Sequence, residues 1–334
     1  MGGNKTDKKK KIAKEDKRPI LDDGLNKWWF VSSDGCGITC MVITIGLHIF
    51  SYWAQWKYIY VPWIGVYSWQ NAVYTFFTVL AVYSHTKCQF TAPGAVPKNC
   101  KAPKLVEGID EGNEDIRKYL YLRRKYVSKR LMIKPPTGHY CSEIEMVVIK
   151  MDHYCPWVNN VVGLFTQKYF LLFVFYTCLC TLWVAIMLGA RVYKCNYGNQ
   201  PRKFSGWDKP QNVQVAVCEV SQWDMITCAA NAVESLIFCI FTIAMGCDQY
   251  EAIGENTPYI DRLQKKKGKE QHIYLTTCEV FGEDFSWRWF FPFAPTKQLT
   301  DQFQQMCYDT LDILNQADKA VKVLVKENQR KEKA

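Results

Sequence analysis

The chain has 334 residues, a net charge of +10 and 15 cysteines, and 49% of its residues are hydrophobic. The cysteines are scattered singly, which argues against a small disulfide scaffold. The apolar residues gather in a few long runs, and the basic residues are spread over the segments between them. This distribution lacks the single basic face of a nucleic-acid-binding protein, so we expect no nucleic-acid partner. It predicts an integral membrane protein instead.

Residues 1–34 form a basic N-terminal region, in which Met1-Gly2-Gly3-Asn4-Lys5-Thr6 is followed by a run of lysines. Gly2 with Thr6 fits the pattern for N-myristoylation. A single myristoyl chain anchors weakly, and neighbouring lysines supply the second membrane signal. Gly2 is therefore a candidate lipidation site, although so short a pattern also occurs by chance.

Four apolar stretches approach or exceed the roughly 20 residues that a membrane-spanning helix needs. They are residues 35–56, 69–84, 169–192 and 225–246. The second stretch is the weakest of the four. Glu234 lies inside the fourth, where a carboxylate is either functional or paired within the helix bundle, with Asn231 as the nearest candidate.

Lysine and arginine are abundant before the first stretch, between the second and third, and after the fourth. By the positive-inside rule, both termini and residues 87–168 are cytoplasmic, and residues 193–224 form a lumenal loop. Cys195 and Cys218 in that loop are able to pair in an oxidising compartment, but the sequence does not decide whether they do.

The resulting organisation has five parts: a basic N-terminus (1–34), two spans (35–86), a cytoplasmic domain (87–168), two more spans (169–247) and a cytoplasmic C-terminal region (248–334). We expect a multi-pass protein of the Golgi, endoplasmic reticulum or plasma membrane.

In the C-terminal region, apolar residues recur every three or four positions from Thr300 onwards and predict one amphipathic helix. It could dock on the cytoplasmic domain, lie on the membrane or bind a partner. The final lysine-rich tail is expected to be disordered.

The segment Asp152-His153-Tyr154-Cys155 comes just before the third span and carries the strongest chemical signal. The reactive form of cysteine is the thiolate, which a neighbouring imidazole can generate and stabilise. In an extended backbone, residues two apart project to the same side, so His153 can serve Cys155 as general base. Asp152 can orient the His153 ring. Pro156 then fixes the backbone, and Trp157 provides an apolar wall.

These residues resemble the Asp-His-His-Cys (DHHC) family of protein S-acyltransferases. Other segments match or resemble the family's motifs in order: Thr91-Ala92-Pro93-Gly94, Ile133-Lys134-Pro135, Asn159-Asn160-Val161-Val162-Gly163, Thr257-Pro258-Tyr259-Ile260-Asp261 and Val280-Phe281-Gly282. The sequence departs from these motifs at Ala92, where the family has Asp, at Asp261, where it has Glu, and at Thr276, where it usually has Asn. The resemblance covers roughly residues 28 to 295. It implies an all-α membrane protein with four transmembrane helices, a small DHHC-type domain between the second and third, and a C-terminal amphipathic helix. It also makes Asn160 a supporting site residue.

The family normally binds two zinc ions, each through three cysteines and one histidine. Alignment on the tetrad puts the first ligand set on Val127, Arg130, Tyr140 and Val147, and the second on Cys141, Ile144, Tyr154 and Val161. A structural zinc site needs four ligands, so we predict that zinc is absent and that an apolar core replaces it. His139 and Cys141 are interpreted as relics of the lost sites.

The resemblance implies a protein-cysteine S-palmitoyltransferase that works through a thioester intermediate. Cys155 would accept palmitoyl or a similar acyl group from acyl-CoA, and pass it to cysteine-containing protein substrates at the cytoplasmic membrane face. No permanent cofactor is expected. The CoA phosphates would face a cluster of basic residues, which could instead lie beside anionic lipid. The cluster consists of Arg123, Arg124, Lys125, Lys129, Arg130 and Lys134.

The alternative to an enzyme is a catalytically inactive membrane scaffold or trafficking adaptor. A channel or transporter is poorly supported, because the spans show little internal symmetry.

Overall fold

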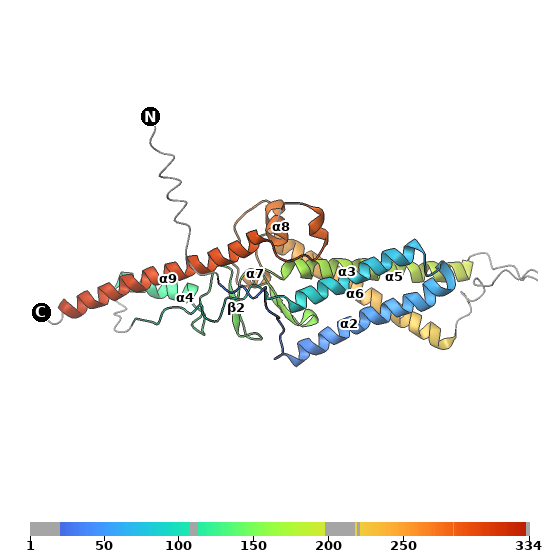
Figure 1. The fold of residues 1–334 in the computed structure, drawn as a ribbon, viewed down its shortest axis with the longest axis horizontal. Coiled ribbons are helices and arrows are strands. Elements are labelled where there is room, and N and C mark those ends of the chain that lie inside the picture. The colour runs from blue at the N-terminus through green and yellow to red at the C-terminus, as the bar shows by residue number, and fades with distance from the viewer. Residues whose placement is uncertain (1–20, 107–112, 198–217, 219–220, 283, 332–334) are drawn as a thin grey trace, which may run out of the picture.

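The computed structural model describes residues 21–106, 113–197, 218, 221–282 and 284–331. The molecule is mainly helical and elongated (Figure 1). A bundle of long helices occupies one end, short strands and turns lie in the middle, and the C-terminal helix extends along the other end. We call residues 91–106 and 113–166, which join the second and third long helices, the intervening domain.

The bundle is made of the four helices predicted from the apolar stretches. They are α2 (Gly35–Gln55), which continues as the π-helix η1 (Trp56–Ile64), α3 (Trp69–Phe90), α5 (Gln167–Tyr197) and α6 (Gln222–Gly254). Three begin at a side chain that accepts a hydrogen bond from the first turn: Asp34, Ser68 and Ser221. The helices extend beyond the apolar stretches. The caps and the packing outside the apolar stretches add helical turns that hydrophobicity does not predict.

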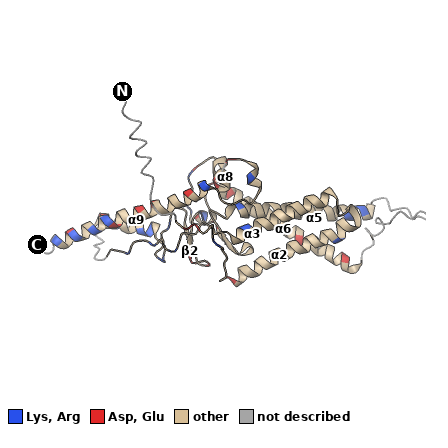
Figure 2. Cartoon of the chain, viewed as in Figure 1, with Lys and Arg blue, Asp and Glu red and all other residues tan. Residues whose placement is uncertain are grey.

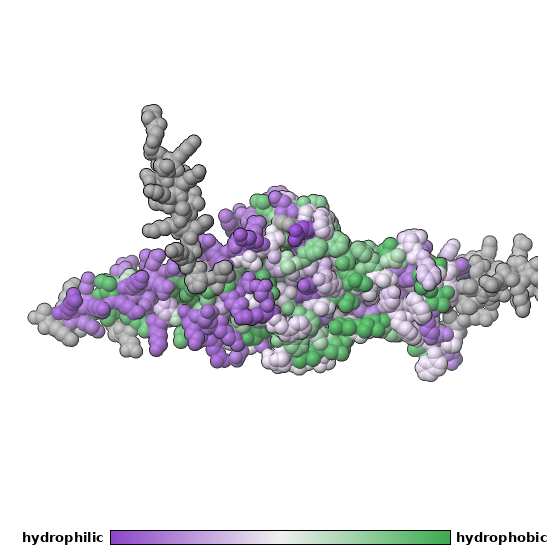
Figure 3. Space-filling model, in the orientation of Figure 1, coloured by the Kyte–Doolittle hydropathy of each residue, from purple (hydrophilic) through white to green (hydrophobic). Residues whose placement is uncertain are grey.

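Among the described residues, three helices are long and apolar enough to cross a membrane: Gly35–Ile64, Gln167–Tyr197 and Gln222–Gly254. Their outward side chains are apolar, as at Ile49 and Ile240, both more than half exposed. Figure 2 shows few charged residues along the bundle, and Figure 3 shows that hydrophobic surface gathers around it. The protein is therefore a helical membrane protein.

The intervening domain contains helix α4 (Glu114–Tyr126) and two antiparallel hairpins. One hairpin pairs β1 (His139–Cys141) with β2 (Met146–Val148), and the other pairs β3 (His153–Cys155) with β4 (Asn160–Val162). In a strand, alternate side chains point to opposite faces. The register therefore sets which of the tetrad residues face the helix bundle.

The C-terminal region contains α7 (Tyr259–Leu263), α8 (Ile273–Phe281), η4 (Trp287–Phe290) and the long helix α9 (Lys297–Lys331). The apolar face of α9 docks on the intervening domain, where Phe303 and Leu314 are buried with Ile133 and Phe165. Further along, Val321 packs against α4. Of the three alternatives that the sequence left open for this helix, the structure shows docking on the intervening domain. The expectation of a disordered tail is wrong up to Lys331, because this packing sustains the helix.

Two features inside the bundle resolve points that the sequence left open. Cys195 at the end of α5 and Cys218 form a disulfide. Glu234 accepts a hydrogen bond from the Asn231 side-chain amide at 3.3 Å, and Asn231 also bonds to Gln55 and Ser51 on α2. Glu234 therefore belongs to a polar contact between α2 and α6.

Candidate active site

The tetrad lies in the hairpin made by β3 and β4, whose connection is a short 3₁₀ turn, η2 (Pro156–Val158). Pro156 begins this turn, where its missing N–H and fixed φ are favourable. Asn159 ends it with a left-handed backbone, φ 47°, a conformation that Asn tolerates better than most residues. The turn returns the chain so that Cys155 pairs with Asn160 in the register.

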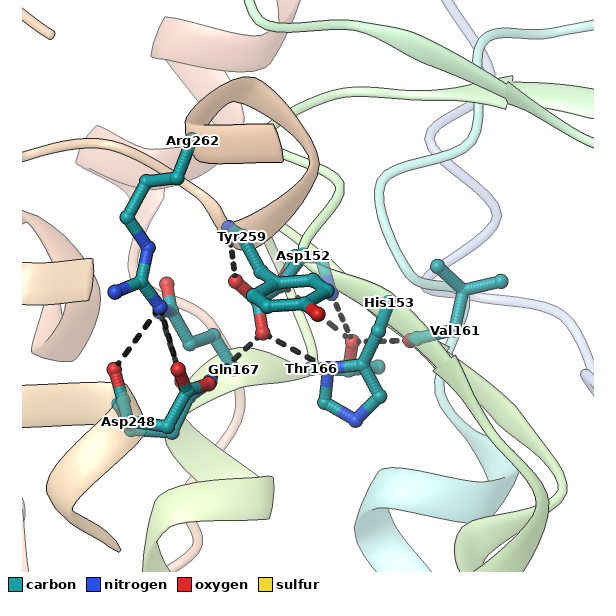
Figure 4. Close-up of polar contacts among 10 residues, drawn as sticks. Asp152, His153, Val161, Thr166, Gln167, Asp248, Tyr259 and Arg262 are labelled. Carbon is teal, nitrogen blue, oxygen red and sulfur yellow. Dashed lines mark hydrogen bonds and ion pairs between the residues drawn. The ribbon is translucent and has the colours of Figure 1, made fainter. Parts of the chain in front are cut away.

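Asp152 is 1% exposed and is fixed by three hydrogen bonds. Its Oδ2 atom accepts from His153 Nδ1 at 2.8 Å and from Gln249 Nε2 of α6 at 2.7 Å, and its Oδ1 atom accepts from the Tyr259 backbone N–H at 2.7 Å. Figure 4 shows Asp152 between the His153 ring and Tyr259. Burial alone would raise the pKa of Asp152, but these bonds, led by that from His153, hold it below its usual value.

Since the carboxylate only accepts, His153 donates from Nδ1 and is left with Nε2 as its second ring nitrogen. Nε2 is buried without a hydrogen-bond partner in the structure. The edge of the ring meets Phe170 of α5, with centroids 5.3 Å apart. Burial lowers the pKa of His153, but the contacts with Asp152 and with the Cys155 thiol outweigh burial and raise it to about 10. These contacts therefore stabilise the charged form of the ring.

Cys155 is 4% exposed and belongs to an apolar cluster with Val162 of β4 and Phe170 and Phe173 of α5. The cluster lies where the intervening domain meets the bundle. A thiol that interacts with an oriented imidazole, beside an apolar surface, is the arrangement that thioester chemistry on a fatty chain requires.

Asn160 and Trp157 anchor the hairpin to the bundle. Asn160 is fully buried, and its amide donates to the carbonyls of Cys88, Gln89 and Thr91 at the end of α3. Its Oδ1 atom accepts from the Trp29 indole at 3.0 Å. The Trp157 ring contacts two phenylalanines of α6, and its carbonyl accepts from His85 and Thr44. These bonds fix the hairpin relative to α2, α3 and α6.

The positions of the second family zinc site do not offer a ligand set. Val161 is fully buried with Cys141 and Tyr154 in one apolar cluster. The Tyr154 hydroxyl donates to Asp34, the N-cap of α2, at 2.7 Å, and also to Asn159. Across the described ranges, no group of three or more His, Cys, Asp or Glu side chains could hold a metal ion. The residues present do not fit zinc.

His139, interpreted from the sequence as a relic of the lost zinc sites, has a structural partner. Its Nε2 atom donates to Asp261 of α7 at 2.8 Å, and both side chains are 6% exposed. Lys266 approaches the same carboxylate at 3.2 Å. Burial would raise the pKa of Asp261, but the bond from His139 and the nearby lysine lower it. His139 thus ties β1 to the segment that also bonds Asp152.

The basic cluster suggested for CoA phosphates is only partly available. Arg123 is buried and donates to the Pro103 carbonyl at 2.7 Å and to Tyr119. Arg130 pairs with Glu145 at 3.8 Å on the surface. Arg123 therefore has a structural role, in which it joins α4 to the segment at Pro103.

The sequence did not identify Gln249, the Tyr259 backbone or Phe170 as parts of this site. Of these, only Tyr259 lies in a segment that the sequence had marked, the Thr257-Pro258-Tyr259 motif. The motif did not indicate that this segment contacts Asp152. Arg262 continues this support on α7 through an ion pair with Asp248 of α6 at 2.6 Å (Figure 4). The other predicted site residues meet in the hairpin, whereas Gly2 lies outside the described residues.

A family model described as DHHC palmitoyltransferase matches residues 121–266. Palmitoyltransferase ZDHHC3 of Homo sapiens is 33% identical over 284 residues, which cover 83% of this chain and 87% of that protein. Palmitoyltransferase ZDHHC7 of Rattus norvegicus is 31% identical over 279 residues, covering 81% and 83%. Probable protein S-acyltransferase 12 of Arabidopsis thaliana is 34% identical over 116 residues, covering 35% and 40%. The chain therefore belongs to the DHHC palmitoyltransferase family and is a protein S-acyltransferase.

Proposed function

We propose that Cys155 is the nucleophile of this S-acyltransferase, His153 its general base and Asp152 the group that orients His153. The observation that carries the proposal is the buried Asp152–His153 pair at 2.8 Å, with Nε2 of the ring free to serve the Cys155 thiol. His153 takes the thiol proton, and the Cys155 thiolate attacks the acyl-CoA carbonyl. The bond to the CoA sulfur breaks, and CoA leaves as a thiol with the proton from His153.

The second half-reaction repeats these roles with a protein substrate. The substrate cysteine gives its proton to His153, and its thiolate attacks the acyl group on Cys155. The Cys155 thiolate leaves and regains its proton from His153. The contacts with Asp152 and the Cys155 thiol raise the pKa of His153, so they favour the ring that has taken a thiol proton while each thioester is exchanged.

The acyl chain is proposed to lie between the helices of the bundle. An open pocket of about 380 Å³ is lined by His48 and Tyr52 of α2 and Trp56 of η1, with Thr78 and Val82 of α3, among others. The His48 ring contacts Phe173, with centroids 6.2 Å apart, and Phe173 belongs to the apolar cluster around Cys155. An acyl chain attached to Cys155 would reach the pocket past Phe173.

We also propose that α3 is a fourth span. It has 22 residues, enough for about 33 Å of helix at 1.5 Å per residue. Its hydropathy is lowered by side chains such as Ser84, His85 and Gln89, but all three are buried and at most 1% exposed. Val79, on the outward face, is apolar. With four spans, the positive-inside rule gives cytoplasmic termini and a cytoplasmic intervening domain in a Golgi, endoplasmic reticulum or plasma membrane protein.

Zinc is proposed to be absent, with apolar packing in its place. The positions of the lost ligands include Val147 and Val161, both fully buried in apolar clusters. Metal analysis of the purified protein tests this proposal directly. We expect no stoichiometric zinc and no loss of thermal stability in the presence of a chelator, whereas two equivalents of bound zinc would refute the proposal.

The function is tested with purified protein and labelled palmitoyl-CoA. The wild type should acquire label that hydroxylamine removes, and should pass it to a peptide with a free cysteine. Cys155→Ser should acquire none. Cys307→Ser is the matched control, because Cys307 is buried like Cys155 but lies on α9 and faces the core of the intervening domain. Equal labelling of Cys155→Ser and wild type would sink the proposal.

A further inference from the structure

The start of α2 rests directly on the catalytic hairpin. A Cβ atom added at Gly37 would lie 2.4 Å from Asn159 Oδ1 and 2.7 Å from the Tyr154 hydroxyl, so only glycine allows this approach. Two turns later, the Thr44 hydroxyl lies 3.4 Å from the Trp157 carbonyl. The helix face that carries Gly37 and Thr44 therefore covers the segment that contains Cys155.

Two cysteines, Cys36 and Cys40, lie along one edge of this face. Positions 37, 40 and 44 share a side of a helix, because three or four residues make about one turn. The Cys40 thiol interacts electrostatically with both Cys36 and Cys155. Cys40 is half-buried, and Cys36 is exposed in the first turn of the helix. The two thiols thus lead from Cys155 to the molecular surface.

We infer that Cys40 and Cys36 form a second acylation site, which receives the fatty acyl group of Cys155 within the same chain. This inference rests on the proposed function, because Cys155 must first carry the group. Cysteines beside a membrane-spanning helix are common positions for S-acylation. At the start of α2, the attached chain would have the exposed apolar surface of the bundle beside it.

The transfer is a thioester exchange and needs no further reactant. His153 takes the proton of the Cys40 thiol, and the Cys40 thiolate attacks the acyl carbonyl on Cys155. The bond between the carbonyl carbon and the Cys155 sulfur breaks, and Cys155 recovers its proton from His153. A second exchange passes the group from Cys40 to Cys36. Cys155 is then free to react with another acyl-CoA.

Cys88 also interacts electrostatically with Cys155, but it differs from the α2 pair. Its thiol lies 3.8 Å from the Thr166 carbonyl, to which it donates, and its side chain is fully buried in the apolar cluster. An acyl chain on Cys88 would have to displace that cluster. The inference is therefore specific to the two cysteines of α2.

The test locates acyl groups on the full-length protein after incubation with palmitoyl-CoA. Free thiols are blocked, thioesters are cleaved with hydroxylamine, and the released thiols are identified by mass spectrometry. Trypsin separates the sites, since residues 28–57 contain Cys36 and Cys40, and residues 151–168 contain only Cys155. The wild type should carry acyl groups on both peptides. Cys155→Ser should lose both signals.

The double variant Cys36→Ser/Cys40→Ser should keep acylation of residues 151–168 at the wild-type level and lose all other hydroxylamine-sensitive label. Cys247→Ser is the control and should match the wild type. Cys247 is exposed on α6. Met245 and Gln249, two positions away on either side, face the active site, so the Cys247 side chain points away from it.

Three outcomes would overturn the inference. In the first, residues 151–168 are acylated and residues 28–57 are not, which leaves the proposed function intact. In the second, residues 28–57 of Cys155→Ser are labelled by palmitoyl-CoA alone. In the third, residues 28–57 of Cys155→Ser are labelled only when the double variant, which keeps Cys155, is added. Transfer would then occur between chains. Absence of label on both wild-type peptides would overturn the proposed function as well.

Discussion

At the scale of single residues, Asp152 connects the hairpin of β3 and β4 to the C-terminal half of the chain. Its two oxygens accept bonds from His153, from Gln249 of α6 and from the backbone at Tyr259. A buried carboxylate with three donors holds its charge and its position. The orientation of His153 therefore depends on residues that lie about a hundred positions away in the sequence.

Replacing Asp152 with Asn should slow acylation of Cys155 strongly, by about 100-fold or more, which is the usual contribution of an oriented general base. Asn would no longer fix the Nδ1 proton of His153 or stabilise the charged ring. The rate of hydroxylamine-sensitive labelling measures the effect. Glu255→Gln, at an exposed carboxylate after α6, is the control and should label at the wild-type rate.

The pKa of His153 makes stability depend on pH in a defined window. The value is raised from 6.5 to about 10, so the charged ring stabilises the fold fully below pH 6.5. That contribution is lost as the pH rises through about 10. The melting temperature of the wild type in detergent should fall over this window more steeply than that of His153→Gln. Parallel curves for the two proteins would contradict the assignment.

At the scale of secondary-structure elements, α9 acts as part of the core of the intervening domain. Phe303 and Leu314 of α9 are buried among residues of the segment that precedes β1 and of the segment that follows β4. The Gln304 side chain also bonds both the N–H and the carbonyl of Leu21. The helix thus joins three distant parts of the chain.

Phe303→Ala should destabilise the protein by about 3 to 5 kcal/mol, the usual cost of removing a fully buried aromatic side chain. Thermal unfolding followed by fluorescence-detected gel filtration measures the loss. Val323→Ala is the control on the same helix, since Val323 is 55% exposed and its truncation should change stability by less than about 0.5 kcal/mol. Equal effects of the two substitutions would exclude the docked arrangement.

At the scale of the whole molecule, the protein divides into an apolar bundle and a polar end. Charged residues gather on α9 and around the intervening domain, whereas hydrophobic surface surrounds the bundle (Figures 2 and 3). The proposed active site lies at the junction, where Cys155 of the hairpin meets Phe170 and Phe173 of α5. In the proposed reaction, a water-soluble acyl donor and its apolar acyl chain would meet at this junction.

The proposed topology predicts which cysteines a membrane-impermeant maleimide reaches in sealed vesicles with the cytoplasmic side outward. The exposed Cys247 should be modified without permeabilisation. Cys195 and Cys218 should be modified only after the membrane is opened and their disulfide is reduced. Modification of Cys195 in sealed vesicles after reduction would contradict the placement of the α5–α6 loop on the opposite side.

The sequence by itself determined the features that depend on local pattern. Apolar runs predicted the helices of the bundle, since hydrophobicity acts on each segment separately. The spacing of His153 and Cys155 predicted that they share a side of one strand. The motifs around them predicted a DHHC family S-acyltransferase, and the similarity to known palmitoyltransferases confirmed that family.

Only the tertiary structure decided the features that depend on distant segments. It chose the docked position of α9 from three alternatives, because packing of its apolar face needs a partner surface that the helix does not contain. It gave His139 a partner in Asp261, and Asp152 its bonds to Gln249 and Tyr259. It also brought Cys40 within electrostatic range of Cys155. Each contact joins residues far apart in the chain, where local propensity carries no information.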